Sequence, residues 1–355
     1  MNTASLHSRA APPTARQHSL ISDLLPLVQD LTTHRAWIYW SDLALSTGLF
    51  WGGLYALSSN SWLPAWLQLA VAVVATLALY RAAIFMHEIV HVPRRKMPGF
   101  MLAWNLACGI PLMLPSFMYQ SHLDHHSARH YGTGQDPEYL PFARSPLASW
   151  LILIAGALLT PVLLFARFAL LAPASLLSPA LRAWLDRHLS SVVLHFRYVR
   201  PEAGPKQARE QRWQEAGATL FIWLMLWLLA NGLLSARGLL FYAGMVLSTL
   251  LINAIRTRFA HHYRLDGQPV SHVEQLADSV NHHAAGRWLT LLEPVGMRFH
   301  ALHHLFPFLP YHSLAEAHRR LMNAPGEAAR FYREVCLSPT QRQVADLAFE
   351  KRIAP

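Results

Sequence analysis

Long apolar stretches separated by short polar segments dominate much of this chain. Residues 37–57 and 63–85 form one closely spaced pair, and residues 218–234 and 239–255 form another. Each stretch is long enough, as an α-helix, to cross a hydrocarbon core about 30 Å thick. Because the connection within each pair is very short, the pattern predicts two helical hairpins that span a membrane.

Basic residues predict how these hairpins are oriented. The first connection (SSNSW) is uncharged, whereas basic residues flank the first hairpin and follow the second: Arg9, Arg16, Arg35, Arg94, Arg95, Lys96, Arg256 and Arg258. Lys and Arg beside membrane spans favour the cytoplasmic side. We therefore expect a multi-pass integral membrane protein whose hairpin ends face the cytoplasm, in the inner membrane if the source is bacterial.

Two further apolar stretches, 100–118 and 149–180, are interrupted by polar residues and prolines. A full crossing by 149–180 would carry segment 182–212, with its seven basic residues, to the outer face. That placement opposes the positive-inside tendency. Both stretches are therefore predicted to be re-entrant or interfacial. Residues 20–31 place Leu and Ile at helical spacing, which predicts a short helix on the membrane surface.

The predicted fold class is an all-α integral membrane protein. It has four transmembrane helices in two hairpins, re-entrant or interfacial helices, and a cytoplasmic helical cap that carries the histidine-rich segments. We expect an N-terminal tail with an interfacial helix (1–36), a membrane domain (37–320) and a C-terminal cytoplasmic helical tail (321–355).

Composition supports a membrane setting. The chain is 53% hydrophobic and only 14% charged, against about a quarter charged in ordinary globular domains. Its net charge of +10 lies mainly beside apolar runs, as expected for contact with anionic lipid headgroups. No basic, aromatic-interleaved module is present, so nucleic acid is not an expected partner. Cys108 and Cys336 lack motif partners, which argues against a disulfide framework or a cysteine metal site.

The arrangement of the 21 histidines is more informative than their number. Three short segments carry them in clusters: HEIVH, SHLDHH and FHALHH, with histidines at 87 and 91, at 122, 125 and 126, and at 300, 303 and 304. Residues three and four apart share one face of a helix. The pattern HxxHH is expected roughly 0.07 times by chance in this chain, by counting template matches, yet it occurs twice. The clusters therefore predict metal binding.

The number of imidazoles bears on the kind of metal site. Eight are too many for one zinc ion, which prefers four ligands, whereas two metal ions would use them. Imidazole suits Fe, Cu, Zn and Ni alike. HEIVH by itself would also suit a zinc protease in which Glu88 activates water, with Asp266 as a distant ligand. That interpretation leaves both HxxHH segments unused. A metal transporter is disfavoured because the histidines lie beside the spans rather than within them.

HEIVH, HLDHH and HALHHLFPFLPYH, in this order, resemble the three histidine boxes of the membrane fatty acid desaturase/hydroxylase superfamily. The resemblance covers roughly residues 37–320, and HHLFPFLPYH is close to the form found in acyl-lipid desaturases. It implies a non-haem di-iron centre, four transmembrane helices and O₂-dependent chemistry on an acyl chain. The implied iron ligands are His87, His91, His122, His125, His126, His300, His303 and His304.

The resemblance also implies a ninth ligand after the fourth span, where this chain offers His261 and His262. We favour His261, which follows Ala260 as in the family's Ala-His pattern. Relatives carry an Asn four residues before this histidine, whereas this chain has Thr257 there. No catalytic residue is implied beyond the metal ligands. Metal-bound histidines usually need a hydrogen-bond acceptor behind them, for which the nearby acids are Glu88, Asp124, Asp136 and Glu138.

The favoured function is an O₂-dependent desaturase that introduces a double bond into a lipid acyl chain. The alternative is a lipid hydroxylase, or an acetylenase or carotenoid-modifying enzyme of the same superfamily. The substrate would be a membrane lipid or an acyl thioester. No fused haem-binding or four-cysteine segment is present, so electrons are expected from an external ferredoxin-type or cytochrome-type donor. Desaturation and hydroxylation differ in how the chain lies against the metal, which the sequence leaves open.

Overall fold

The computed structural model describes residues 15–282 and 288–336. Within them, the regular structure is helical, and two isolated bridges, His261–Ser279 and Asn281–Phe299, are the only β pairings. The predicted all-α class is confirmed. The outer parts of the predicted tails, 1–14 and 337–355, lie outside the described residues.

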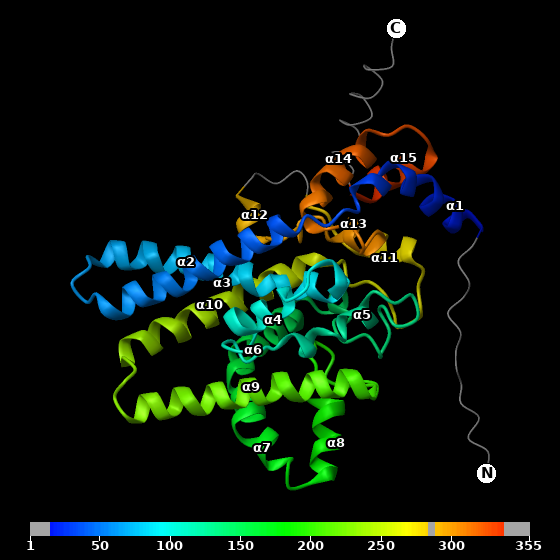
Figure 1. Cartoon of the computed structure of the whole chain (residues 1–355). Helices are drawn as coiled ribbons and strands as arrows, with labels where there is room; N and C mark the ends of the chain where they lie inside the picture. Colours follow the sequence, from blue (N-terminus) through cyan, green and yellow to red (C-terminus); the bar gives the residue numbers. More distant parts are fainter. Residues whose placement is uncertain (1–14, 283–287, 337–355) are drawn as a thin grey trace, which may run out of the picture.

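The first predicted hairpin is present as α2 (Ala36–Ser59) and α3 (Ala65–His91), which pack along each other (Figure 1). Their close approach depends on Gly53, where a Cβ atom would lie 2.9 Å from the Cβ atom of Ala75. The second pair is α9 (Pro205–Ala230) and α10 (Ala236–Ala260), which diverge from their connecting turn. Helix α10 packs against both α2 and α3. The ends of α3 and α10 therefore reach the same part of the molecule.

Among the described residues, four helical segments are long and apolar enough to cross a membrane, by length and composition: α3, Pro146–Ala174, α9 and α10. The chain is thus a multi-pass membrane protein, but the set differs from the prediction at one position. Helix α2 has 24 residues but contains Asp42, several Ser and Gly, and many aromatic residues, which lower its mean hydropathy. Its Trp37, Trp40, Trp51 and Tyr55 are exposed on the outside of the hairpin.

The stretch predicted to dip and return takes a different form. Helix α6 (Pro146–Phe165) continues through a π-helical segment (Ala166–Leu171) into α7 (Ala172–Ala174), and the chain turns back only in α8 (Pro179–His188). After α8, Val192 N donates to Met118 O (2.8 Å) and Leu194 N donates to Pro137 O (2.7 Å). The segment from α6 to α8 therefore begins and ends in the same region of the molecule. Its first part, Pro146–Ala174, is by itself long enough to span a membrane.

The other interrupted stretch folds back against α3, in line with the re-entrant prediction. It comprises α4 (Phe100–Trp104), a π-helical turn (Asn105–Gly109) and a 3-10 helix (Ser116–Tyr119). Trp104 Nε1 donates to Ala82 O (2.7 Å), and Ser116 N donates to Asn105 Oδ1 (2.8 Å). These bonds place α5 (His122–His125) beside the end of α3.

The remaining helices form a cap over the ends of α3 and α10 (Figure 1). They are α1 (Ala15–Leu24), α11 (His272–Asp278), α12 (Leu289–Leu292), α13 (His300–Leu305), α14 (Leu314–Asn323) and α15 (Glu327–Cys336). Short 3-10 helices follow α1 at Leu25–Leu27 and Gln29–Leu31. The remaining 3-10 helices are Arg94–Lys96, Phe142–Arg144 and Tyr311–Ser313.

The N-terminal segment, predicted to form a helix on the membrane surface, is part of this cap. Leu24 and Val28 are buried in a cluster with Leu302 of α13 and Tyr332 of α15. The apolar face that suggested a membrane helix is instead covered by the apolar faces of the C-terminal helices, because both faces bury more surface together than either does alone.

Candidate metal centre

The three histidine segments lie on three separate helices that meet under the cap. His87 and His91 occupy the last turn of α3, His122, His125 and His126 lie in and after α5, and His300, His303 and His304 lie on α13. His261 is the residue that follows α10. The structure brings these nine sequence-predicted residues together, and all are buried except His91, which is half-buried.

The nine side chains form two groups, each of which could hold a metal ion. One group has five members, His87, His91, His122, His126 and His303; the other has four, His125, His261, His300 and His304. Within each group, one ring nitrogen per residue lies within 4.8 Å of all the others. The groups adjoin, because the rings of His126 and His304 stack with their centroids 4.2 Å apart.

Ring nitrogens face one another inside each group. In the five-histidine group, His303 Nε2 lies 3.2 Å from the Nε2 atoms of both His91 and His126, and His126 Nε2 lies 2.9 Å from that of His122. In the four-histidine group, His261 Nε2 lies 3.3 Å from His125 Nε2 and 3.0 Å from His300 Nε2. His304 Nε2 lies 3.2 Å from His300 Nε2. A cation between these nitrogens would offset the repulsion of their lone pairs.

These spacings fit metal coordination. Metal–imidazole bonds of about 2.1 Å place neighbouring nitrogens at right angles about 3 Å apart. His87 supports the same conclusion, because both its ring nitrogens are buried without a hydrogen-bond partner among the described residues. A buried polar atom without a partner is costly, and a bound ion would satisfy one of them. The donor set therefore fits two adjacent ions of a metal that accepts imidazole, such as iron.

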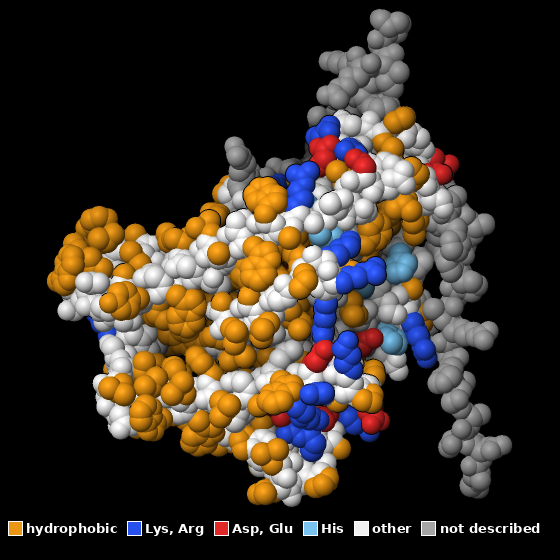
Figure 2. Space-filling view, in the orientation of Figure 1, with side chains coloured by type: hydrophobic (Ala, Val, Ile, Leu, Met, Phe, Trp, Pro, Cys, Tyr) orange, Lys and Arg blue, Asp and Glu red, His pale blue; other side chains and the backbone are white. Residues whose placement is uncertain are grey.

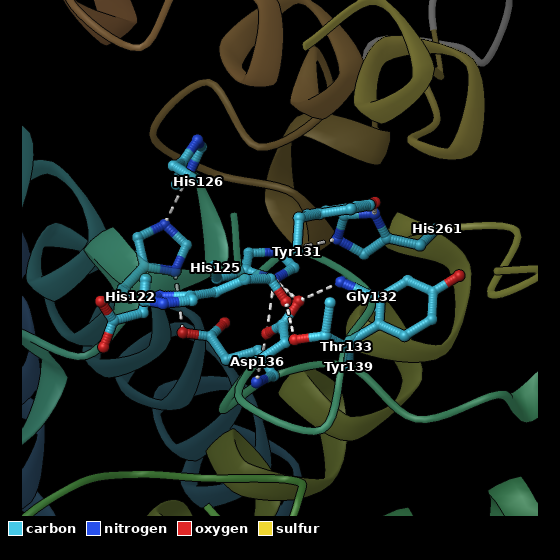
Figure 3. A network of polar contacts seen from close by, with 12 residues as sticks. His122, His125, His126, Tyr131, Gly132, Thr133, Asp136, Tyr139 and His261 are labelled. Atoms are coloured by element: carbon cyan, nitrogen blue, oxygen red, sulfur yellow. Dashed lines mark hydrogen bonds and ion pairs between the residues drawn. The ribbon is translucent and has the colours of Figure 1, made fainter. Parts of the chain in front are cut away.

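Two carboxylates hold histidines of the second segment in place (Figure 3). His125 Nδ1 lies 2.9 and 3.0 Å from the two oxygens of Asp136, and His122 Nδ1 lies 2.8 Å from Glu138 Oε1. Asp136 in turn accepts from the backbone N–H groups of Gly132 and Glu138, each at 2.9 Å. A carboxylate behind Nδ1 fixes the proton there and leaves Nε2 free for a metal. The sequence expectation for these two acids agrees with their positions.

The other two acids face away from the metal centre. Glu88 Oε2 accepts from Tyr39 OH at 2.6 Å, on the α2 side of α3, and Asp124 Oδ2 accepts from Tyr198 OH at 2.7 Å. Neither acid belongs to a group that could hold a metal among the described residues, and neither does Asp266. The protease interpretation required Glu88 beside the metal and Asp266 as a ligand, so this geometry does not support it.

His261 has hydrogen-bond partners that the sequence did not predict. Its Nδ1 lies 2.8 Å from Tyr131 OH and 3.1 Å from Ser279 Oγ. Tyr131 OH also donates to Asp278 Oδ2 at 3.1 Å, as Tyr139 OH does at 2.9 Å. No local motif marks Tyr131 or Asp278, since they come from separate parts of the chain. The alternative ligand, His262, lies outside both groups and contacts Asp278 through its backbone N–H (2.7 Å).

Burial shifts the protonation of these groups. Burial, together with the neighbouring histidines, holds the pKa of His126, His261, His300, His303 and His304 well below the usual value. Burial also lowers the pKa of His125, but the Asp136 carboxylate outweighs it and the net pKa is raised. Burial would raise the pKa of Glu138, yet the charge and hydrogen bond of His122 bring that pKa to about 2. With the exception of His125, these imidazoles are therefore held neutral, and an ionised carboxylate lies behind His122.

A cavity of about 440 Å³ adjoins the five-histidine group. Its wall includes His87, Tyr119, Glu138 and Thr257. Most of the other lining side chains are apolar and come from α3, the re-entrant segment, α6 and α10: among them Ala83, Ile84, Leu112, Met113, Leu158, Leu164, Val246, Leu247 and Leu250. This size and lining suit a hydrocarbon chain.

Comparison with known proteins agrees with this arrangement. The family model described as fatty acid desaturase matches residues 60–335. The chain therefore belongs to the fatty acid desaturase/hydroxylase superfamily and is an oxidoreductase of that class. It is 38% identical over 330 residues to a ceramide hydroxylase of Caulobacter vibrioides (strain NA1000 / CB15N), with 90% of this chain and 91% of that protein covered.

Proposed function

We propose that this protein hydroxylates a membrane lipid at two iron ions held by the nine histidines. One observation carries the proposal: imidazoles from four separate parts of the chain gather in two adjoining groups, one of which lines an apolar cavity. Bound iron would supply the activation of O₂. The cavity would place one C–H bond of the hydrocarbon beside the five-histidine group.

Similarity to a ceramide hydroxylase supports hydroxylation over the desaturation that the sequence favoured. It also supports an amide-linked, ceramide-like lipid as the substrate class. The balanced reaction takes one C–H bond, O₂, two electrons and two protons, and gives an alcohol and water. Desaturation remains the second candidate because the third histidine segment resembles that of acyl-lipid desaturases. That reaction takes the same oxidant and electrons and gives a double bond and two waters.

The chain's own residues would hold the metal ligands in place and position the hydrocarbon. Asp136 and Glu138 keep the Nδ1 protons on His125 and His122, which aims the opposite nitrogens at the centre. Apolar side chains keep water from the cavity, which limits side reactions. The fixed position of the hydrocarbon matters because displacing the reacting carbon by about 1 Å is costly.

The proposal places the histidine groups at the cytoplasmic surface, in the inner membrane if the source is bacterial. Figure 2 supports this orientation: hydrophobic side chains cover one end of the molecule, and Lys and Arg gather beside the exposed histidines at the other. Cations at this boundary suit anionic headgroups. Electrons would come from a separate ferredoxin-type or cytochrome-type protein, and an acidic surface on that donor would be attracted to the same cations.

Expression of the chain in a bacterial host that supplies ceramide-like lipid tests the proposal. Mass spectrometry of extracted lipids is expected to show the gain of one oxygen atom, taken from ¹⁸O₂ when that gas is supplied. A His303→Ala variant should lose the product, and His188→Ala, at an exposed position of α8, should keep it. Loss of two hydrogens without gain of oxygen would favour desaturation, and no lipid change with full iron loading would refute both.

A further inference from the structure

The cavity contains a cation that the proposed metal centre does not use. Arg256, about one turn before the end of α10, lines the cavity wall beside Asn253 and Thr257 of the same helix. Its Nε donates to Asn253 Oδ1 (3.1 Å) and its Nη2 donates to Thr257 Oγ1 (3.3 Å). A guanidinium has more N–H donors than these two bonds use.

Arg256 differs from Arg81 of α3 and from Arg167, which follows α6. Arg81 pairs with Asp42 and Arg167 pairs with Glu215, each through a 2.5 Å contact. In the part of the chain that the structure describes, no carboxylate lies within ion-pair distance of Arg256, although the charge of Glu293 acts on it from farther away. A charged side chain in a largely apolar setting is costly and usually marks function. A bound molecule that offers oxygen atoms would offset that cost.

The polar part of the cavity lies at its metal end. Along α10 the lining begins at Tyr242 and ends at Thr257, a length of roughly 22 Å at 1.5 Å per residue. The lining side chains from Ala243 to Leu250 are apolar apart from Thr249, and the polar ones, Asn253, Arg256 and Thr257, come last, nearest His261. On α3, the lining likewise ends at His87. A lipid would therefore place its polar linkage near the metals and its long chain in the apolar remainder.

Glu138 adds hydrogen-bond acceptors to the polar end of the cavity, where Arg256 supplies donors. This ionised carboxylate lines the same cavity, accepts from His122 and Tyr119, and retains further lone pairs. Arg256 offers donors and Glu138 offers acceptors. An amide linkage with a neighbouring hydroxyl has a carbonyl to accept and N–H or O–H groups to donate, so it matches both. An ester linkage matches only the arginine, and a plain hydrocarbon matches neither.

We infer that Arg256 is a specificity-determining residue that binds the carbonyl oxygen of an amide-linked lipid, so that oxidation falls within a few bonds of that linkage. This inference rests on the proposed function and adds to it the residue that recognises the amide linkage and the place of reaction. The long chain beyond the linkage would occupy the space between α3, α6 and α10.

Lipid binding by the purified full-length protein tests the inference without relying on turnover. The probes are an N-acyl amide lipid, an ester of equal chain length and an alkane of equal length. The wild type should prefer the amide. Arg256→Gln should weaken amide binding about tenfold or more, as expected for loss of a charge-assisted hydrogen bond, and should leave alkane binding unchanged. Arg256→Lys should restore part of the preference.

Arg258→Gln is the matched control, because Arg258 lies on the same helix but donates to Ser149 Oγ (3.0 Å), and it is absent from the cavity lining. It should bind all three probes as the wild type does. Iron content measured on every variant should be unchanged. An Arg256→Gln protein that keeps the amide preference overturns the inference, as does one that loses iron rather than preference.

The position of the product hydroxyl separates this inference from the proposed function. Fragmentation mass spectrometry should place the hydroxyl close to the amide. A hydroxyl in the distal half of the chain would overturn the inference and leave the hydroxylase function standing. An amide preference that depends on Arg256 without any hydroxylated product would refute the function and leave the binding role standing.

Discussion

His303 Nε2 lies 3.2 Å from His91 Nε2, although 212 positions separate the two residues in the chain. The contact joins the end of α3 to α13 of the cap, and His126 of the second segment meets the same nitrogen of His303. His303 is therefore where all three histidine segments meet.

Replacement of His303 by alanine should empty the five-histidine group. We expect the iron content to fall from about two per chain toward one, and product formation to fall roughly a hundredfold or more. Replacing a residue that only hydrogen-bonds to a metal ligand should cost less than this. Elemental analysis and lipid mass spectrometry measure these effects. His188→Ala should change neither value. Full iron content in the His303 variant would contradict the proposed ligand role.

Asp136→Asn should weaken metal retention without removing a proposed ligand. The amide keeps one accepting oxygen, but the second carboxylate oxygen, which now accepts from His125 and Gly132, is replaced by an NH₂ group that can only donate. The amide also carries no charge to hold the proton on His125. A ten- to hundredfold loss of affinity is typical of such partners, as an order of magnitude. Competition with a chelator measures it. Glu334→Gln, in an exposed ion pair with Arg330, should match the wild type.

Glu88→Gln should leave product formation within about threefold of wild type. The glutamine oxygen can still accept the hydrogen bond from Tyr39, and the carboxylate does not face the metal groups. A catalytic base would instead cost about a hundredfold or more. Turnover of lipid by the purified variant decides between these outcomes. A loss of that size with iron fully bound would restore a catalytic role for Glu88.

The iron-free protein should lose thermal stability as the pH falls from about 7 toward 5. Burial holds the pKa of His122, His126, His261, His300, His303 and His304 below the usual value of about 6.5. In this window the unfolded chain therefore binds more protons than the folded one, and the free energy of unfolding decreases with decreasing pH. His125, whose pKa is raised, acts in the opposite sense but is a single group.

Thermal unfolding in detergent at pH 7.5 and pH 5.5 measures this effect. Iron loading should reduce the pH dependence, since a bound ion competes with protons for the same nitrogens. An iron-free protein that is more stable at the lower pH would show that these histidines are protonated when folded.

Much of the fold could be predicted because lipid imposes strong local rules. A segment that crosses a membrane must be apolar over its whole length, so helices α3, α9 and α10 are visible as continuous runs. The packing of the N-terminal segment against α15 was not predicted, because an apolar face has the same sequence pattern whether lipid or protein covers it. The long helical arm after Pro146 was not predicted either, because its proline at 161 lies within a continuing helix.

The sequence by itself determined which histidines share a helix face, since that depends only on spacing within one turn. Only the tertiary structure decided how they divide: adjacent His125 and His126 enter different groups, and His261 rather than His262 joins one of them. It also decided that Glu88 points away and that Tyr131 and Asp278 stand behind His261. These relationships depend on how distant helices cross, which no local pattern encodes.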